Sequence, residues 1–224
     1  MVGSMLQVKS LCVSFTKEYY TLNDISFELD KGQKMIVVGN KESGRTALIR
    51  TLVGLEPIAK GEIIYKNLPL EKVDFENDVD LGYIPAIPAF LDKKTVKQNI
   101  EYVLNLRGVE GSLFAAKTNN ALVEFGLDFI KNKKVKELSY FDKLKLALAR
   151  LSTRPIEILL VDDIFTKLST MEKDKICKMI KSIVKANNCA TLIMVDSEEV
   201  AQMLGYSKKY LVFGALQDEP NIQE

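Results

Sequence analysis

One segment of the sequence has the residue types and spacing of a phosphate-binding loop. It runs Gly39-Asn-Lys-Glu-Ser-Gly-Arg-Thr46 and matches the pattern G-x-x-x-x-G-K-[ST] at every fixed position except the lysine, which is Arg45 here. The glycines of this pattern let successive backbone N–H groups face a phosphate, and the N-terminus of the following helix adds its dipole. The residues that we expect to hold a nucleotide are Gly39, Asn40, Lys41, Glu42, Ser43, Gly44, Arg45, Thr46 and Ala47.

Two side chains of this loop have specific chemical roles in the prediction. Thr46 can place its hydroxyl on Mg²⁺, which makes it a candidate metal ligand. Arg45 keeps the positive charge of the usual lysine, but its planar guanidinium is bulkier than an ammonium group and is not an equivalent substitute. If the loop is a working phosphate cradle, Arg45→Lys should tighten ATP binding. The alternative interpretation is a glycine-rich turn that binds no ligand.

A second segment supplies carboxylates at the end of an apolar run. Ile158-Leu-Leu-Val161 reads as a buried strand, and Asp162 and Asp163 follow it directly. Acids in this position hold Mg²⁺ directly or through water near the β- and γ-phosphates, so Asp162 is the second candidate metal ligand. Together with the Gly39 loop, this segment favours the core of a P-loop nucleoside triphosphatase, with ATP and Mg²⁺ as the expected ligands.

Strands and helices alternate at both ends of the chain, and a helical block lies between them. The predicted strands and helices therefore give an α/β class with an inserted helical subdomain. We expect a single domain with a core over about 5–88 and 155–215 and a helical subdomain over about 89–154. Residues 1–4 read as an expression scar, with Met5 as the native start. The predicted strands cover 6–15, 25–29, 35–38, 61–65, 81–84, 158–161 and 191–195, and the predicted helices cover 47–54, 171–186 and several segments within 95–153.

The composition excludes several kinds of chemistry. The 224 residues contain no histidine, which removes every histidine general base and histidine-based zinc catalysis. The formal net charge is only +1, so nothing in the charge balance points to nucleic acid as a partner. The cysteines are three and scattered, which fits a reducing cytosol and no disulfide partner. No apolar run approaches the roughly 18 residues of a membrane span.

Over nearly its whole length the chain resembles the nucleotide-binding domain of an ATP-binding-cassette (ABC) transporter. Residues 46–55 resemble the helix after the family's P-loop, and Gly61-Glu-Ile-Ile-Tyr65 resembles its Gly-Glu-Ile strand. Leu138-Ser-Tyr-Phe-Asp142, followed by Leu146-Ala-Leu-Ala-Arg150, stands where the family has L-S-G-G-Q and its A-L-A-R helix. The intervals from Arg45 to Ala86, Ser139 to Asp162 and Asp163 to Asp196 are also close to those of the family. The resemblance implies a P-loop core with an N-terminal antiparallel β subdomain and a helical subdomain.

The same comparison shows where this sequence departs from the family pattern. The signature keeps Ser139, but its two glycines are Tyr140 and Phe141 and its glutamine is Asp142. Two aromatic side chains should block the close approach of this segment to the γ-phosphate held by an opposite monomer. The other departures are Ala86 for the Q-loop glutamine, Asp163 for the catalytic glutamate, Asp196 for the switch histidine and Ser169 for the D-loop aspartate.

The resemblance and its departures together imply a subunit with degenerate catalytic motifs. We expect a cytoplasmic chain, peripheral to the membrane through a permease subunit, a second nucleotide-binding subunit or both. The apolar stretch 85–91 corresponds to the family's docking site for the membrane subunit, and a plain buried loop explains it equally well. Tyr19 and Tyr20 are the nearest candidates for the aromatic residue that stacks on adenine.

Two other functions stay open at this stage. A slow but genuine ATPase would use Asp163 to polarise water, while Arg45 and Thr46 hold the nucleotide. Asp163 is one methylene shorter than glutamate, and a displacement of about 1 Å can cost on the order of 100-fold in rate. A non-transport P-loop protein such as a kinase would explain the Gly39 loop and Asp162, but not the segment 138–150.

Overall fold

The computed structural model describes residues 4–14, 20–75 and 77–219 and contains two β-sheets. An antiparallel sheet has the strand order β2-β1-β4-β5, and a larger sheet has the order β10-β9-β3-β8-β7-β6. In the larger sheet all neighbours pair in parallel except β9 and β10. The strands are β1 (Leu6–Val13), β2 (Leu22–Leu29), β3 (Lys34–Val38), β4 (Lys60–Tyr65), β5 (Leu68–Pro69), β6 (Leu81–Ile84), β7 (Ile158–Val161), β8 (Ala190–Val195), β9 (Ser207–Val212) and β10 (Ala215–Gln217).

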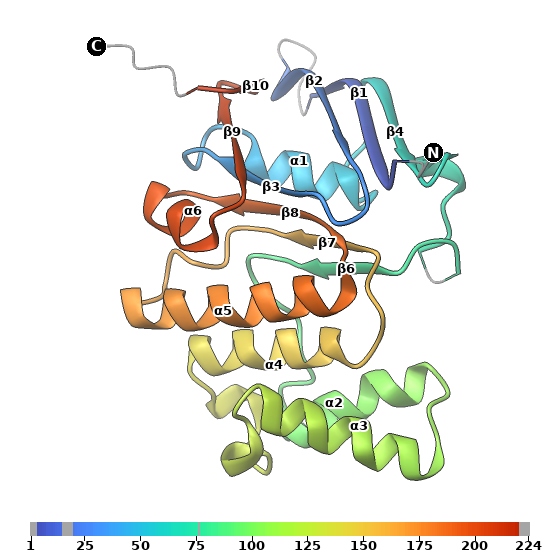
Figure 1. Cartoon of the computed structure of the whole chain (residues 1–224), viewed down its shortest axis with the longest axis vertical. Helices are drawn as coiled ribbons and strands as arrows, with labels where there is room; N and C mark the ends of the chain where they lie inside the picture. The colour runs from blue at the N-terminus through green and yellow to red at the C-terminus, as the bar shows by residue number, and fades with distance from the viewer. Residues whose placement is uncertain (1–3, 15–19, 76, 220–224) are drawn as a thin grey trace.

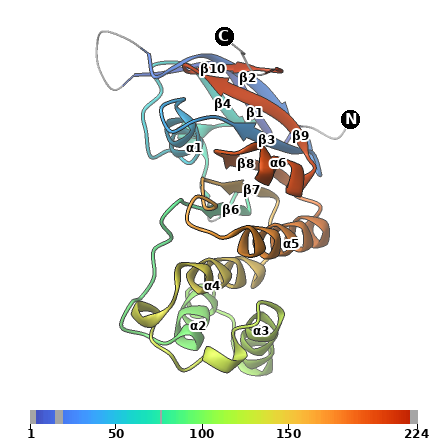
Figure 2. The same ribbon diagram turned by 90° about the vertical axis from the view of Figure 1, so that its left-hand side faces the viewer.

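The helices lie on both sides of the larger sheet (Figure 1). The α-helices are α1 (Arg45–Leu52), α2 (Val96–Leu106), α3 (Gly111–Glu124), α4 (Tyr140–Ser152), α5 (Thr170–Asn187) and α6 (Glu198–Leu204), with short 3₁₀ turns at Leu70–Lys72, Asp128–Ile130 and Val135–Glu137. Helix α1 lies between the two sheets, whereas α5 and α4 cover the opposite face (Figure 2). Helices α2 and α3 pack beyond α4 at the far end of the molecule.

Side chains of the central strands point alternately to the two faces of the larger sheet, and each face has its own hydrophobic core. On β3, Met35 and Val37 face the layer that contains α1 and the antiparallel sheet, whereas Ile36 and Val38 face the layer of α4 and α5. Successive side chains of a strand point to opposite faces of its sheet, so a strand buried on both faces is apolar throughout. The continuous apolar runs of β3, β7 and β8 have this origin.

The predicted α/β class, with helices α2 to α4 inserted between β6 and β7, is confirmed. The helix predicted over 47–54 begins at Arg45 and ends at Leu52, and the helix predicted over 171–186 covers Thr170–Asn187. The elements α6, β9 and β10 lie after residue 195, where the sequence pattern predicted no helix or strand. Strand β9 reads Ser-Lys-Lys-Tyr-Leu-Val, and only Leu211 in it is fully buried, so its apolar pattern is weak.

Candidate functional site

The parallel sheet brings four loops to one of its edges. The Gly39 loop follows β3, Asp196 follows β8, Asp162 and Asp163 follow β7, and Ala86 lies just beyond β6. These four strands are adjacent in the sheet and run in the same direction, so their carboxyl ends meet at one edge. The Gly39 amide donates to the Val195 carbonyl at 3.1 Å, which joins the first two loops directly.

Glycines shape the loop between β3 and α1. Gly44 has a φ of 98°, a left-handed conformation that side chains disfavour, and a Cβ there would meet Leu22 at 2.7 Å. A Cβ at Gly39 would lie 2.5 Å from Ser43 Oγ. The chain can make this turn only with glycine at both positions. Helix α1 begins directly after it, so the amides of its first turn lack partners inside the helix.

Asn40 collects most of the hydrogen bonds within the loop. Its side-chain Oδ1 accepts from the Glu42 amide at 3.0 Å. Its carbonyl accepts from Ser43 Oγ at 2.8 Å, from the Ser43 amide at 3.3 Å and from Arg45 Nε at 3.3 Å. The loop is therefore held in shape by its own polar groups, and the Arg45 side chain folds back over it.

Arg45 forms an ion pair with Asp163, the second acid after β7. Arg45 Nη2 lies 3.1 Å from Asp163 Oδ2, and the two side chains are only 5% and 14% exposed. Each partner also has a buried atom with no hydrogen-bond partner among the described residues, namely Arg45 Nη1 and Asp163 Oδ1. An anion could accept a hydrogen bond from Nη1, and a water molecule or a cation could provide the missing partner of Oδ1.

Asp162 is buried at the end of β7 and lies next to this pair. Its Oδ1 accepts from the Asp163 amide at 2.8 Å. Burial raises the pKa of Asp162, an effect that the hydrogen bond from the Asp163 amide and the nearby Arg45 guanidinium partly offset. A dication bound here would replace the hydration that Asp162 has lost, so its environment suits a Mg²⁺ ligand. Mg²⁺ often takes only one or two protein ligands, and no larger acidic or cysteine cluster exists within the described residues.

Thr166 links Asp163 to Asp196. Its hydroxyl lies 3.0 Å from Asp163 Oδ2 and 3.3 Å from Asp196 Oδ2, so it can donate to one carboxylate at a time. Thr166 was not among the residues predicted from the sequence. A hydroxyl three residues beyond the second acid of β7 was the only signal that could have found it.

Several hydrogen bonds hold the segment Ser139–Asp142 at the start of α4. Ser139 Oγ accepts from the Asp142 amide at 3.1 Å and donates to Asp142 Oδ2 at 2.9 Å, which caps α4. The Tyr140 hydroxyl lies 3.2 Å from the Ala86 carbonyl and 3.1 Å from the Ile164 carbonyl. Burial, Asp163 and Asp162 raise the pKa of Tyr140 to about 12, which keeps this hydroxyl protonated as a donor. The Phe141 ring packs on the core, with Lys145 Nζ 5.2 Å from its centre.

The structure thus brings together most of the residues selected from the sequence. The loop 39–47, Asp162, Asp163 and Asp196 share one sheet edge, and Tyr140 connects the signature segment to Ala86. Tyr19 lies outside the described residues. Tyr20 is 40% exposed, and its ring faces Lys60 Nζ at 5.4 Å.

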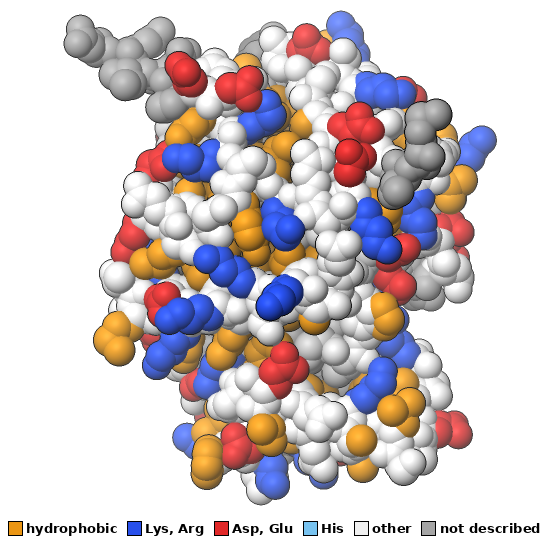
Figure 3. Space-filling model, viewed as in Figure 1, with side chains coloured by type: hydrophobic (Ala, Val, Ile, Leu, Met, Phe, Trp, Pro, Cys, Tyr) orange, Lys and Arg blue, Asp and Glu red, His pale blue; other side chains and the backbone are white. Residues whose placement is uncertain are grey.

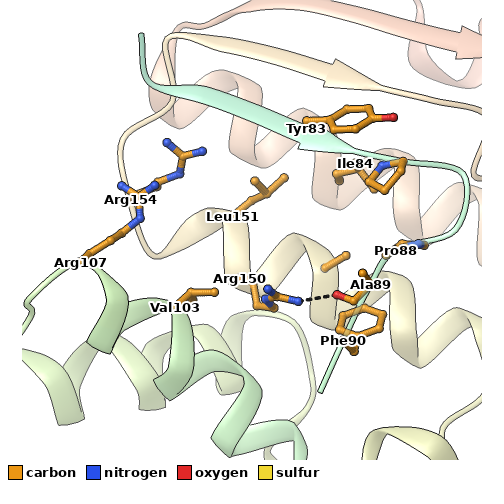
Figure 4. Close-up of a pocket in the computed structure, with 12 residues that line it drawn as sticks. Tyr83, Ile84, Pro88, Ala89, Phe90, Val103, Arg107, Arg150, Leu151 and Arg154 are labelled. Carbon is orange, nitrogen blue, oxygen red and sulfur yellow. Dashed lines mark hydrogen bonds between the residues drawn. The ribbon is translucent and has the colours of Figure 1, made fainter. Parts of the chain in front are cut away.

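A cavity of about 310 Å³ lies away from the loop, between β6, α2 and α4. Apolar side chains including Tyr83, Phe90 and Leu151 line it, and so do Arg107, Arg150 and Arg154. Arg150 Nη1 donates to the Ala89 carbonyl at 2.8 Å, while Arg107 and Arg154 approach each other at the opposite end (Figure 4). None of the described residues that line this cavity is acidic.

Known proteins resemble this chain in both sequence and structure. The family model described as ABC transporter matches residues 22–166. The molybdate/tungstate import ATP-binding protein WtpC of Pyrococcus horikoshii is 29% identical over 206 residues, which is 90% of this chain and 57% of that protein. WtpC of Pyrococcus abyssi is 27% identical over 220 residues, which is 98% of this chain and 63% of that protein. The chain therefore spans less than two thirds of the length of these relatives.

Two solved structures share the fold at 18% sequence identity. An ATP binding subunit of an ABC transporter superposes with a TM-score of 0.81, covering 95% of this chain and 88% of that chain. The cbiO1 protein of Clostridium perfringens, part of the ABC transporter complex cbiONQ, gives 0.80 and covers 95% and 86%. The chain therefore belongs to the ABC transporter family, and its fold is that of an ATP-binding subunit.

Proposed function

We propose that this chain is the ATP-binding-type subunit of an ABC transporter, with degenerate catalytic motifs and a regulatory or structural role. Its partners would be a membrane permease, an active ABC ATPase or both. The relatives named as import ATP-binding proteins and the cbiO1 structure support the transport assignment. No helix within the described residues is long and apolar enough to cross a membrane. In this proposal the chain lies at the cytoplasmic face of the membrane through its contact with the permease.

The signature segment carries the degenerate part of the proposal. The resemblance to the family implies that this segment meets a phosphate on the opposite monomer through backbone amides and a serine hydroxyl. Here the Ser139 hydroxyl caps its own helix, and Tyr140 occupies the first glycine position with a side chain tied to Ala86 and Ile164. The segment therefore offers a second subunit neither a free hydroxyl nor a glycine backbone.

The cavity between β6, α2 and α4 is the docking site that we propose for the permease. It coincides with the stretch 85–91 that the family resemblance marks as the membrane-subunit site. Burial and the positive charge of the nearby Arg107 lower the pKa of Arg154, and Asp80, which pairs with Arg154 at 3.6 Å, offsets part of this effect. Arg107 therefore repels Arg154 at one end of the cavity. An acidic side chain on the permease segment would relieve this repulsion, while its apolar side chains would cover Phe90 and Leu151.

The nucleotide and its metal fit the polar groups at the sheet edge. The loop 39–47 would hold the phosphates, and Thr46 and Asp162 would hold Mg²⁺. The metal would neutralise charge on the β- and γ-phosphates. A slow ATPase is the second candidate function, because Asp163 keeps a carboxylate beside Thr166 at the position of the catalytic glutamate.

The first test is phosphate release by the purified chain with Mg-ATP, together with calorimetric titration of the same sample. We expect no phosphate release above that of the Asp162→Asn variant, because the signature segment cannot complete a second subunit's site. Turnover that Asp163→Asn abolishes would overturn the degenerate assignment in favour of the slow ATPase.

A further inference from the structure

We infer that Asp163 is an internal ligand of the Gly39 loop, which competes with phosphate for Arg45 and so weakens binding of polyphosphate ligands. This inference deepens the proposed function, since it assumes that the loop is a nucleotide site. It assigns Asp163 the role of an affinity-limiting residue. It also explains how an arginine can occupy the lysine position without remaining an uncompensated buried charge.

The Arg45 side chain lies buried between the Gly39 loop and the end of β7. It leaves the first residue of α1, reaches back over the loop to the Asn40 carbonyl, and extends across to the end of β7. Only 5% of this side chain is exposed. A buried guanidinium needs a negative partner, because an unpaired charge away from water is costly. Asp163 provides that partner.

The pair has unused hydrogen-bonding capacity. Arg45 contacts Asp163 through one nitrogen, Nη2, and its buried Nη1 has no partner within the described part of the chain. Arginine and phosphate favour contacts in which two N–H groups bind two oxygens. The single contact to Asp163 leaves Nη1 without an acceptor. A phosphate group, which has several oxygens, could accept from both Nη1 and Nη2.

The Asp163 carboxylate contacts Arg45 and Thr166 through a single oxygen. Its Oδ2 accepts from both Arg45 Nη2 and Thr166 Oγ1, and its Oδ1 is buried. A general base must reach the proton of an attacking water with a free oxygen. In this arrangement one oxygen is occupied and the other is out of contact with solvent, so the closed pair presents Arg45 and Asp163 to each other and not to a ligand.

The consequence for binding is a closed state that must open before phosphate can contact Arg45. The apparent dissociation constant rises by the inverse of the open fraction. If the pair is closed about nine tenths of the time, the measured affinity is roughly tenfold weaker than that of the open loop. Replacing the carboxylate with an amide of the same shape should remove this penalty.

The test is calorimetric titration with inorganic tripolyphosphate, which presents the phosphates without the base or sugar. We expect Asp163→Asn to bind tripolyphosphate about tenfold more tightly than the unmodified chain. Glu198→Gln is the matched control, because Glu198 begins α6 directly after β8 and its carboxylate pairs with Lys208 at 2.8 Å instead of with the loop. It corrects for the general loss of negative charge and should change the affinity by less than about threefold. Equal effects of the two variants, or no tightening in Asp163→Asn, would overturn the inference.

A second variant keeps the test decisive if Asp163→Asn does not fold. In Asp163→Ser the carboxylate is absent while Arg45 and its hydrogen bond to the Asn40 carbonyl remain, so the closed state should be lost and tripolyphosphate should bind more tightly. An unchanged or weaker affinity in this variant would contradict the inference. In both variants the readout is binding alone, so it stays separate from the phosphate-release assay. ATP turnover would overturn the proposed degenerate role without affecting this result.

Discussion

Asp162 is a carboxylate that the fold buries, and burial disfavours its charged form. It is 3% exposed, and burial raises its pKa above the value of an unfolded chain. The native state therefore holds a proton on Asp162 more tightly than the unfolded state does. As the pH rises from about 4 through the folded pKa, this proton is lost and the free energy of unfolding falls.

Asp162→Asn should therefore stabilise the chain at neutral pH. The amide avoids the cost of burying a charge, and its oxygen can still accept from the Asp163 amide. We expect the Tm at pH 7 to rise by roughly 2–4 °C. Thermal unfolding from pH 4 to pH 8 should also show a smaller loss of stability with pH than in the unmodified chain.

The control is Asp196→Asn, whose carboxylate is exposed at the same sheet edge. It should leave the Tm at pH 7 within about 1 °C. A lower Tm for Asp162→Asn at pH 7 would show that the ionised carboxylate stabilises the loop.

Helix α4 is held against the sheet by a side chain at a position where the family has glycine. Tyr140, at its first turn, contacts the carbonyls of Ala86 and Ile164 and so ties the helical layer to the loops after β6 and β7. The family's glycine could make no such link. The link predicts that α4 stays fixed on the sheet whether or not a nucleotide is bound.

Tyr140→Phe removes the hydroxyl and leaves the ring in place. We expect the free energy of unfolding in urea to fall by about 1 kcal/mol, since the half-buried carbonyls lose their donor. Hydrogen exchange of the amides around Ile164 should become faster by the same free-energy difference.

Tyr102→Phe, on the exposed side of α2, is the matched control, because its ring is 42% exposed. It should change the unfolding free energy by less than about 0.5 kcal/mol. If both variants unfold alike, the Tyr140 hydroxyl does not hold α4 against the two loops.

The Gly39 loop and the arginine-lined cavity lie in different parts of the molecule. The loop 39–47 and the acids after β7 lie at the carboxyl edge of the parallel sheet, whereas the arginine-lined cavity lies between β6 and the helical layer. Lys and Arg side chains are interspersed with Asp and Glu on the face shown in Figure 3, so this face has no field of a single sign. In contrast to this face, the described residues that line the cavity include three arginines and no acid.

If the cavity is the docking site proposed above, Arg107→Glu should weaken binding of the chain to a permease without affecting the fold. Arg107 is exposed, and a carboxylate there would repel an acidic permease segment. We expect sedimentation with inside-out vesicles from the cell that makes the protein to fall at least roughly fivefold. Lys178→Glu, on the exposed face of α5, makes the same change of charge away from the cavity and should sediment normally. Equal sedimentation of both variants would exclude the cavity as the docking site.

The sequence by itself determined the class of fold and the position of the loop. Buried strands such as Met35–Val38 and Ile158–Val161 are apolar on both faces, and the glycines at positions 39 and 44 meet a steric requirement that no other residue satisfies. Each of these patterns lies within a short segment of the chain, so a single sequence is enough to detect it. The elements after residue 195 were missed because β9 is only partly buried and its pairing with β3 is distant in the chain.

Only the tertiary structure decided what the substituted residues do. Arg45 and Asp163 stand far apart in the sequence, and they meet because β3, β8 and β7 are parallel neighbours whose ends share one edge. Tyr140 reads from the sequence as an aromatic side chain that should block an opposite monomer, yet its ring lies against its own chain and its hydroxyl reaches Ala86 and Ile164. Residue type fixes charge and hydrogen-bonding capacity, but the partner of a buried polar group depends on which strands the fold places side by side.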